Sequence, residues 1–339
     1  MILAGGVGSR FWPLSTPQRP KQLLPLADDA PLLANTLRRL RPLVPAERTL
    51  VLTNASLVAP IAALAPELPA ANLIAEPKPA GTAAALAWAA AEIERRDGAG
   101  AVMVCVHADW CIGDEATFRD TLARAADVAE RSRSLVTVGI VPSRPDPGFG
   151  YIQPGEAHES GARRVARFVE KPDRATAERM VRDGHLWNSG IFVWRVGDFL
   201  DEVRARTPEV APALAAAAGD IGRFFAEVRS VSVDVGVLER SERVLVLPGD
   251  FGWDDVGTWA ALRRVRPADE CGNATSGAVH ALHATGNVVH AEGNAVVLYG
   301  VSDLVVVTRD GLTLVTTVDR SADLKTLIDS LPPAFRGRD

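Results

Sequence analysis

Short apolar runs alternate with longer stretches of helical periodicity over the first 141 residues of the chain. Helical spacing of apolar positions predicts helices over residues 31–43, 57–65, 81–96 and 114–131. Strands are expected from Ile2 onward and over residues 49–54, 72–77, 101–109 and 135–141. The run "AVMVCVHAD" is almost wholly apolar, which is typical of a strand buried on both faces. This alternation predicts an α/β fold, with a mostly parallel sheet that carries helices on both faces.

The pattern changes after residue 142. The segment "PSRPDPGFGYIQPG" is too rich in proline and glycine to form a helix. Beyond it we expect strands over residues 165–172 and 190–196, and helices over 174–183, 197–228 and 254–265. A break in composition over residues 266–277 precedes short β-rich runs and a last helix near 321–331. We therefore predict an α/β domain over residues 1–265 and a small β-rich domain over 273–339.

Composition and charge exclude several classes of protein. The chain has 339 residues, is 47% hydrophobic and carries a net charge of -5, so we expect no nucleic-acid partner. Its three cysteines, Cys105, Cys111 and Cys271, have no metal-ligand spacing, and so few thiols fit a reducing cytoplasm. No signal-peptide pattern follows Met1, and the alanine-rich segment over residues 81–96 is too short to span a bilayer. We expect a cytoplasmic protein with no membrane partner.

The glycine-rich opening is the first candidate for chemistry. In "ILAGGVGSR", Gly5, Gly6 and Gly8 would let main-chain N–H groups approach an anion closely. Arg10 and Lys21 add positive charge suited to phosphates. The prolines that follow keep the loop extended, and the third glycine of a dinucleotide-binding motif is missing. A nucleotide-phosphate cradle is the interpretation that remains beside that of a tight structural turn.

Polar side chains follow other strand ends, where open parallel sheets bind ligands. Asp109 ends the apolar run and is a natural Mg²⁺ ligand, although a carboxylate there could also cap a helix. In "GWDDVGTW", one of Asp254 and Asp255 is expected to cap the following helix, and the other to face the site. Glu170 and Lys171 would diverge around a sugar phosphate at a strand end, or form an ordinary surface pair. Asn188 offers an amide to a ligand, or belongs to a hairpin turn.

Taken together, these segments resemble the sugar-1-phosphate nucleotidylyltransferases, in particular the mannose-1-phosphate guanylyltransferases. The resemblance covers almost the whole chain in order, and its most specific blocks are "ILAGGVGSRFWPLSTPQRPKQ", "FVEKP" and "GWDDVGTW". It implies a Rossmann-like catalytic domain and a small C-terminal domain that resembles a left-handed β-helix and supports a homodimer. Longer relatives append an isomerase domain; this chain ends too early to carry one, so we expect no isomerase activity.

The resemblance also implies roles for single residues. Nucleotide binding falls to Gly5, Gly6, Gly8, Glu76, Pro77, Gly81 and Thr82, and catalysis to Arg10 and Lys21. Sugar-phosphate binding falls to Gly150, Glu170, Lys171, Asn188 and Asp234, and Mg²⁺ binding to Asp109 and Asp255. The implied reaction is the Mg²⁺-dependent transfer of GMP from GTP to mannose 1-phosphate by a single in-line displacement.

This sequence departs from the family pattern at three places. His107 and Trp110 replace the usual neighbours of the metal-binding Asp109, the segment over residues 147–150 has lost two hydroxyls, and residues 80–82 read Ala-Gly-Thr. The chain also begins only one residue before its first strand. Two alternatives therefore stay open: the same chemistry with another sugar 1-phosphate or nucleoside triphosphate, and a catalytically silent protein that binds a sugar nucleotide and regulates a partner.

Overall fold

The computed structural model describes residues 1–6, 8–332 and 335, with Ser9 described by its main chain alone. The chain forms two compact units, and each is built from three separate segments. The first unit comprises Met1–Gly5, Arg39–His107 and Asp114–Phe251. The second comprises Gly6–Arg38, Ala108–Gly113 and Gly252–Asp339. These compact units do not coincide with the two domains predicted from the sequence, which meet after residue 265. That domain boundary stays a prediction.

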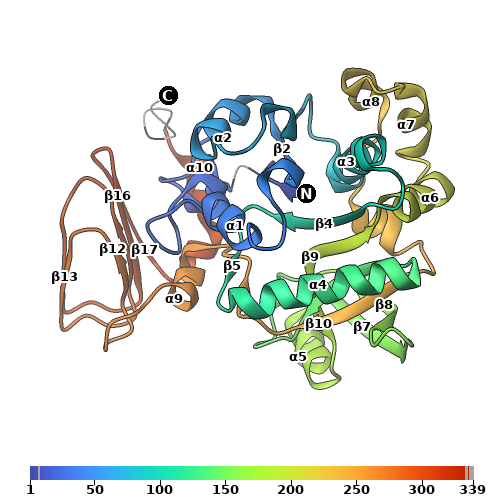
Figure 1. Ribbon diagram of the computed structural model, residues 1–339. Coiled ribbons are helices and arrows are strands. Elements are labelled where there is room, and N and C mark those ends of the chain that lie inside the picture. The colour runs from blue at the N-terminus through green and yellow to red at the C-terminus, as the bar shows by residue number, and fades with distance from the viewer. Residues whose placement is uncertain (7, 333–334, 336–339) are drawn as a thin grey trace. The chain divides into compact units, whose positions relative to one another are not determined.

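A nine-stranded sheet forms the centre of the first unit (Figure 1). Its strands lie in the order β3 (Leu73–Glu76), β2 (Val51–Asn54), β1 (Ile2–Leu3), β4 (Val102–His107), β9 (Leu186–Arg195), β6 (Leu135–Ile140), β10 (Val244–Gly249), β8 (Arg163–Val169) and β7 (Tyr151–Ala157). The first four are parallel neighbours, as are β6 and β10. β9 runs antiparallel to β4 and β6, and β8 antiparallel to β10 and β7. The sheet is therefore mixed, although every strand except β8 and β9 runs in one direction.

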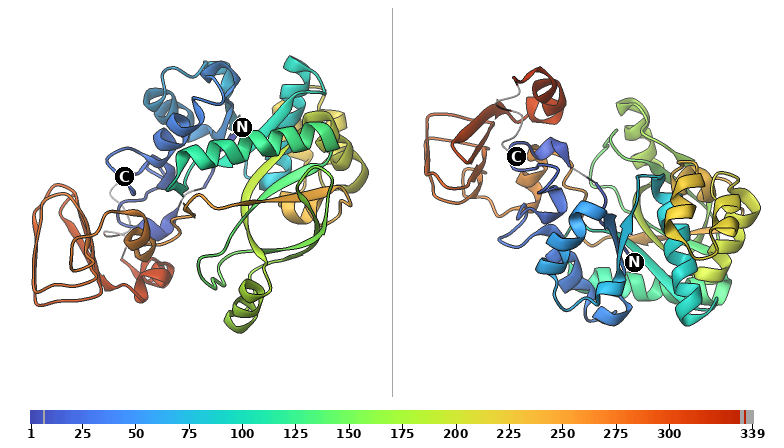
Figure 2. Two further views of the ribbon diagram at one scale, coloured as in Figure 1. Left: turned by 60° about the horizontal axis from the view of Figure 1, so that its bottom comes forward. Right: turned by 90° about the horizontal axis from the view of Figure 1, so that it is seen from above.

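Helices cover both faces of this sheet (Figure 2). α4 (Glu115–Ser132) packs on β4, β6, β9 and β10. The opposite face buries the alanine-rich side of α3 (Gly81–Asp97) and one side of α6 (Val196–Arg206) against Met103, Cys105 and Trp194. The remaining helices of the unit are α2 (Val58–Leu64), α5 (Arg174–Arg182), α7 (Ala211–Ala217) and α8 (Ile221–Glu227). The predicted α/β fold is confirmed.

Two predicted helices are shorter than the apolar pattern indicated. The stretch over residues 197–228 forms α6, α7 and α8 in place of one helix, because Pro208 follows α6 and Ala218 adopts a left-handed conformation after α7. In the stretch over residues 254–265, only the turn η7 (Trp259–Ala261) and the short α9 (Leu262–Val265) are helical. β11 (Trp253–Asp254) occupies its start and pairs with β5 (Cys111–Ile112).

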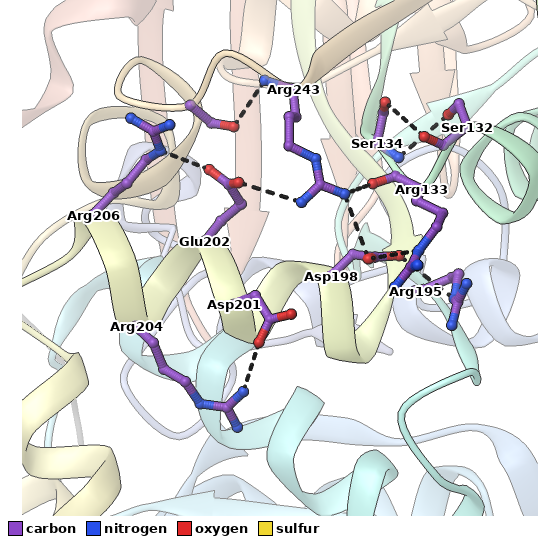
Figure 3. Close-up of polar contacts among 11 residues, drawn as sticks. Ser132, Arg133, Ser134, Arg195, Asp198, Asp201, Glu202, Arg204, Arg206 and Arg243 are labelled. Carbon is purple, nitrogen blue, oxygen red and sulfur yellow. Dashed lines mark hydrogen bonds and ion pairs between the residues drawn. The ribbon is translucent and has the colours of Figure 1, made fainter.

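Arginines surround a buried carboxylate at the start of α6 (Figure 3). The Asp198 side chain is 3% exposed, and guanidinium nitrogens of Arg133, Arg195 and Arg243 lie 3.4, 3.5 and 3.5 Å from it. Arg243 also lies 3.6 Å from Glu202, one turn further along α6. Because Arg133 follows α4 and Arg243 precedes β10, this network connects α6 to both neighbours.

The second unit contains a β-coil of parallel strands. β12 (Ala274–Ser276), β14 (Val288–Ala291) and β16 (Leu304–Arg309) form one wall, and β13 (Val279–Leu282) and β15 (Val296–Tyr299) form another. β17 (Leu312–Thr317) closes the first wall in antiparallel orientation, before η8 (Arg320–Asp323) and α10 (Leu324–Ser330). The predicted β-rich C-terminal region is confirmed, while its left-handed sense stays a prediction.

The N-terminal loop belongs to the same unit as this coil. Phe11, Leu14, Leu24 and Leu26 are fully buried in a cluster that also contains apolar residues of β14, β16, β17 and α10. Two short turns, η1 (Ser9–Phe11) and η2 (Lys21–Leu23), and the helix α1 (Leu32–Leu40) interrupt the otherwise extended loop. The loop is thus part of a hydrophobic core rather than a flexible surface segment.

Candidate active site

Lys21 is the centre of a group of predicted site residues in the second unit. The Lys21 side chain is 9% exposed, and its Nζ donates hydrogen bonds to Asp109 Oδ2 at 2.8 Å and to the main-chain oxygen of Asp255 at 2.6 Å. A Cβ built on Gly8 would lie 2.3 Å from Lys21 Cβ, and Gly8 has a φ of +63°. Only glycine fits there, so the glycine loop closes directly over the lysine stem.

Asp109 and Asp255 provide two carboxylates beside this ammonium. Burial raises the pKa of Asp255, Lys21 opposes that shift, and the negative charges of Asp254 and Asp109 add to it. Arg10 is exposed, and its charge also acts to lower the pKa of Asp255. Gly6, Gly8, Arg10, Lys21, Asp109 and Asp255 are named the loop cluster below.

The structure distinguishes the two neighbouring aspartates. Asp254 Oδ1 accepts the Val256 N–H at 2.8 Å, and its Oδ2 accepts the Arg264 Nε–H at 2.7 Å. Asp254 therefore holds a turn and an arginine in place of the predicted helix cap. Val256 is buried and has a φ of +47°, an unfavourable conformation for a β-branched residue. Such strained conformations cluster at functional sites, and Val256 directly follows Asp255 in the chain.

A second group of predicted residues lies in the first unit. Asn188 donates from Nδ2 to Asp234 Oδ1 at 2.7 Å, and its main-chain N–H donates to the Gly150 carbonyl at 2.8 Å. A Cβ built on Gly150 would lie only 2.8 Å from Glu170 Oε2. Burial raises the pKa of Asp234, the Asn188 hydrogen bond opposes it, and Glu170 raises it further. Gly150, Glu170, Asn188 and Asp234 are named the sheet-edge cluster.

Lys171 and Glu170 form a surface pair, the second of the two interpretations that the sequence left open. Lys171 Nζ lies 2.6 Å from Glu170 Oε1, and both side chains are more than 60% exposed, at 65% and 62%. Lys171 has a φ of +42°, which turns the chain after β8 and brings the two side chains together. The surface-pair interpretation describes this structure, and a ligand phosphate would have to compete with Glu170 for the ammonium.

Four of the predicted nucleotide-binding residues in the first unit, Glu76, Pro77, Gly81 and Thr82, differ from one another in burial and contacts. Glu76 ends β3, its Oε2 lies 3.5 Å from a Cβ built on Gly5, and burial raises its pKa to about 7. Pro77 is exposed. Gly81 has a φ of +82° and packs on the main chain of Val231, while Thr82 Oγ1 accepts the Val233 N–H at 2.8 Å. The last two residues thus fix the start of α3 to the segment that leads to Asp234.

The two carboxylates of the loop cluster fit a magnesium ion. Mg²⁺ prefers hard oxygen ligands, commonly takes only one or two carboxylates from the protein, and completes its shell with water and phosphate oxygens. Burial and the neighbouring carboxylates both disfavour the charged form of Asp255, a cost that a divalent cation would relieve. No group of three or more His, Cys, Asp or Glu side chains suited to a metal occurs among the described residues.

Comparison with known proteins identifies the family of this chain. The model of the nucleotidyl transferase family matches residues 1–271. The chain belongs to the nucleotidyl transferase family. A mannose-1-phosphate guanylyltransferase of Salmonella muenchen is 36% identical over an alignment of 346 positions, which covers 98% of this chain and 72% of that protein. The xanthan biosynthesis protein XanB of Xanthomonas campestris is 37% identical over 99% of this chain and 73% of its own.

A solved structure has the same fold over nearly the full length of both chains. It is described as a mannose-1-phosphate geranyltransferase from Thermus thermophilus and is 36% identical. The TM-score is 0.89, and the match covers 97% of each chain. The α/β nucleotidyltransferase fold is therefore shown for this chain by sequence and by structure, and the chain is a nucleotidyltransferase.

Sequence reasoning missed two groups near the sheet-edge cluster of this nucleotidyltransferase. The Arg144 guanidinium lies 5.0 Å from the Trp187 ring and 5.6 Å from the Phe149 ring, next to Gly150 and Asn188 in sequence. Glu239 has a pKa raised by burial and by the charges of Asp234 and Glu170. Neither residue stands in a motif with a chemical signature; the proximity of Arg144 to the "GFG" segment was the one available signal.

No helix in the described part of this nucleotidyltransferase combines the length and the apolar character needed to cross a membrane. All three cysteines are free, with Cys105 and Cys111 buried and Cys271 exposed.

Proposed function

We propose that this nucleotidyltransferase transfers GMP from GTP to mannose 1-phosphate, giving GDP-mannose and pyrophosphate. The observation that carries the proposal is the loop cluster, in which a buried lysine, an arginine and two carboxylates surround a glycine turn. Close relatives bear the name mannose-1-phosphate guanylyltransferase, which supports the choice of substrates. The sheet-edge cluster supplies amide and carboxylate groups suited to sugar hydroxyls.

The reaction is a single displacement at phosphorus. A phosphate oxygen of mannose 1-phosphate forms a bond to the α-phosphorus of GTP, and the bond from that phosphorus to the bridging β-phosphate oxygen breaks. The electron pair leaves with pyrophosphate, so no covalent enzyme intermediate is needed. The obstacle is repulsion between two polyanions, and catalysis of such transfers rests on positioning and charge stabilisation.

The loop cluster is suited to that task. Lys21 and Arg10 would neutralise charge on the departing pyrophosphate, while main-chain N–H groups near Gly6 and Gly8 would bind phosphate oxygens. Asp109 and Asp255 would hold Mg²⁺, which when bound supplies additional neutralisation of phosphate charge. Lys21 contacts Asp109 in the structure, so its ammonium would exchange that carboxylate for a phosphate oxygen when the nucleotide binds.

A pyrophosphate-release assay tests this function. GTP and mannose 1-phosphate with Mg²⁺ should give turnover, and chelation of the metal should abolish it. Replacing GTP with ATP, CTP or UTP, and mannose 1-phosphate with glucose or fucose 1-phosphate, should lower kcat/KM. Faster turnover with another pair would support the same chemistry on that pair, and calorimetric binding of GDP-mannose without pyrophosphate release would support a silent regulator.

We also propose that two copies of the chain associate in the cytoplasm through the C-terminal β-coil. We further propose that this coil is left-handed. The proposed association is supported by an exposed apolar face on β13 and β15, where Leu282, Val297 and Tyr299 are 48%, 70% and 70% exposed. Exposed apolar patches of this kind commonly mark interaction surfaces. Light scattering should show a dimer that Val297→Asp dissociates, whereas a wild-type monomer would refute the association.

A further inference from the structure

The loop that carries Lys21 is held by several residues from distant parts of the second unit. Arg309, the last residue of β16, donates from Nη1 to the Leu14 carbonyl at 2.6 Å. Trp259 Nε1 donates to the Trp12 carbonyl at 3.2 Å, and the buried Arg266 guanidinium donates to the Leu26 carbonyl. These contacts fix both ends of the loop segment over residues 12–26.

An ion pair holds the middle of the same segment. Arg19 Nη1 donates to Glu292 Oε1 at 2.9 Å and to Oε2 at 3.0 Å. A tight turn presents this arginine, because the main-chain N–H and carbonyl of Thr16 and Arg19 pair with each other at 3.1 Å. Glu292 follows β14, and its own N–H donates to the Thr308 carbonyl at 3.0 Å. Both partners of the ion pair are thus attached to ordered main chain.

The surroundings of Glu292 keep its charge available to Arg19. Arg309 Nε lies 3.9 Å from Glu292 Oε1, and His290 Nε2 lies 3.8 Å from Oε2. Burial and the charge of Arg266 lower the pKa of His290 to about 4, so this imidazole is neutral at pH 7. At 37% side-chain exposure, Glu292 is too accessible for its pairing to contribute much to stability, yet its geometry is well defined.

We infer that Glu292 is a positioning residue for nucleotidyl transfer, acting through Arg19 on Lys21. Pro20 alone separates the two basic residues, and its φ of -71° is fixed by the ring, so displacement of Arg19 moves Lys21 with it. Lys21 has little room to compensate, because Gly8 packs against its stem and its Nζ contacts Asp109. The inference rests on the proposed function of Lys21 and gives the C-terminal coil a role in catalysis.

The test compares Glu292→Gln with Asp310→Asn. The first keeps the shape of the side chain and removes the charge that holds Arg19. The second removes an exposed carboxylate that pairs with Arg309 at 2.9 Å and leaves the Arg19–Glu292 ion pair in place, so it is the matched control. Displacing a catalytic group by a fraction of an ångström typically lowers turnover, and we expect kcat to fall about 10-fold in Glu292→Gln.

Three further readouts separate positioning from loss of structure. The KM for mannose 1-phosphate and the urea unfolding midpoint should stay at wild-type values, because neither depends on the position of Lys21. Arg19→Met should reproduce the effect, and the double variant should be no slower than either single variant. Unchanged kcat in Glu292→Gln would overturn the inference, and so would a fall in kcat that follows a lowered unfolding midpoint.

The design also distinguishes failure of this inference from failure of the proposed function. If the wild type releases pyrophosphate from another pair of substrates, the same variants are measured with that pair. If it releases none, the proposed function fails, and amide hydrogen exchange over residues 12–26 becomes the measurement. Faster exchange there in Glu292→Gln, and not in Asp310→Asn, would support the restraint, whereas equal exchange would overturn it.

Discussion

Replacement of Lys21 by methionine tests the role proposed for the loop cluster. Methionine keeps most of the length and the apolar stem of the lysine, but loses the positive charge and three N–H donors. In the structure those donors reach Asp109 Oδ2 at 2.8 Å and the Asp255 carbonyl at 2.6 Å. Lys21→Met therefore removes a charge that is already held in place before any substrate binds.

The magnitudes of two effects decide what the variant should do. Loss of one preorganised charge-stabilising donor raises a reaction barrier by about 2–4 kcal/mol, or roughly 30- to 1000-fold in kcat. A hydrogen bond to a charged group contributes about 1.5–3 kcal/mol to stability, but burial of an ammonium costs a comparable amount. The Lys21 side chain is 9% exposed and that of Asp109 is 33% exposed. Methionine therefore avoids the cost of burying an ammonium, and water hydrates the more accessible Asp109 carboxylate in place of the lost hydrogen bond. We expect the free energy of unfolding to change by about 1 kcal/mol or less.

Turnover and unfolding therefore have to be measured on the same preparations. Pyrophosphate release at saturating GTP and mannose 1-phosphate gives kcat, and urea titration gives the free energy of unfolding. Lys21→Arg is the control, because it keeps the charge and should retain more activity than Lys21→Met. Turnover of Lys21→Met within about threefold of wild type would refute the phosphate role, since that corresponds to less than about 1 kcal/mol. A loss of stability larger than the rise in the barrier would assign Lys21 to structure instead.

Three further variants test other parts of the structure. Glu76→Gln should remove a pH dependence of stability. The pKa of Glu76 is raised from 4.5 to about 7 in the folded protein, so between these pH values the folded state binds one more proton than the unfolded state. The wild type therefore loses stability as pH rises through that window. Partial exposure limits this loss to about 1–2 kcal/mol, which urea unfolding at pH 5 and pH 8 would measure; equal pH slopes for wild type and variant would contradict it. Asp198→Asn should cost about 2–3 kcal/mol of stability with unchanged kcat, because three arginines then lose a buried carboxylate; a change below about 0.5 kcal/mol would show the network to be dispensable. Gly150→Ala should raise the KM for mannose 1-phosphate about 10-fold and leave the KM for GTP unchanged, because the new Cβ displaces the Glu170 carboxylate; a selective effect on GTP would place Gly150 elsewhere.

Local patterns predicted most of the secondary structure because periodicity depends on neighbours in sequence. The predicted strand over residues 135–141 is β6 (Leu135–Ile140), and the predicted helix over 81–96 is α3 (Gly81–Asp97). The helical stretch expected over residues 197–228 is divided into α6, α7 and α8, because its apolar spacing continues across Pro208 and Ala218, where the backbone leaves the helical conformation. The pattern also could not predict strand direction. β9 has an apolar run like those of its neighbours β4 and β6, although it runs antiparallel to both.

The candidate site was predictable where strand ends bring residues together. Asp109 and Asn188 were expected from segments next to strands, whereas Asp234 was expected only from the family resemblance, and Asn188 does contact Asp234 at 2.7 Å. The choice between Asp254 and Asp255 depended on Arg264, a tertiary partner ten residues away along the chain that no local pattern reveals. The sequence left open whether Glu170 and Lys171 diverge around a ligand or form a surface pair, and in the structure Lys171 Nζ lies 2.6 Å from Glu170 Oε1.

The C-terminal coil has two surfaces with different proposed roles, association with a second copy and restraint of the Lys21 loop. Val297 and Tyr299 are each 70% exposed on β15, whereas Glu292 and Arg309 bind the Lys21 loop through Arg19 and the Leu14 carbonyl. Because the association surface and the restraint on the loop involve different side chains, one substitution can remove either of them without the other. Val297→Asp should therefore abolish the proposed dimer and leave kcat unchanged, while Glu292→Gln should lower kcat and leave the association unchanged. If Val297→Asp also lowered kcat, association itself would restrain the loop, and Glu292 would transmit that restraint rather than supply it alone.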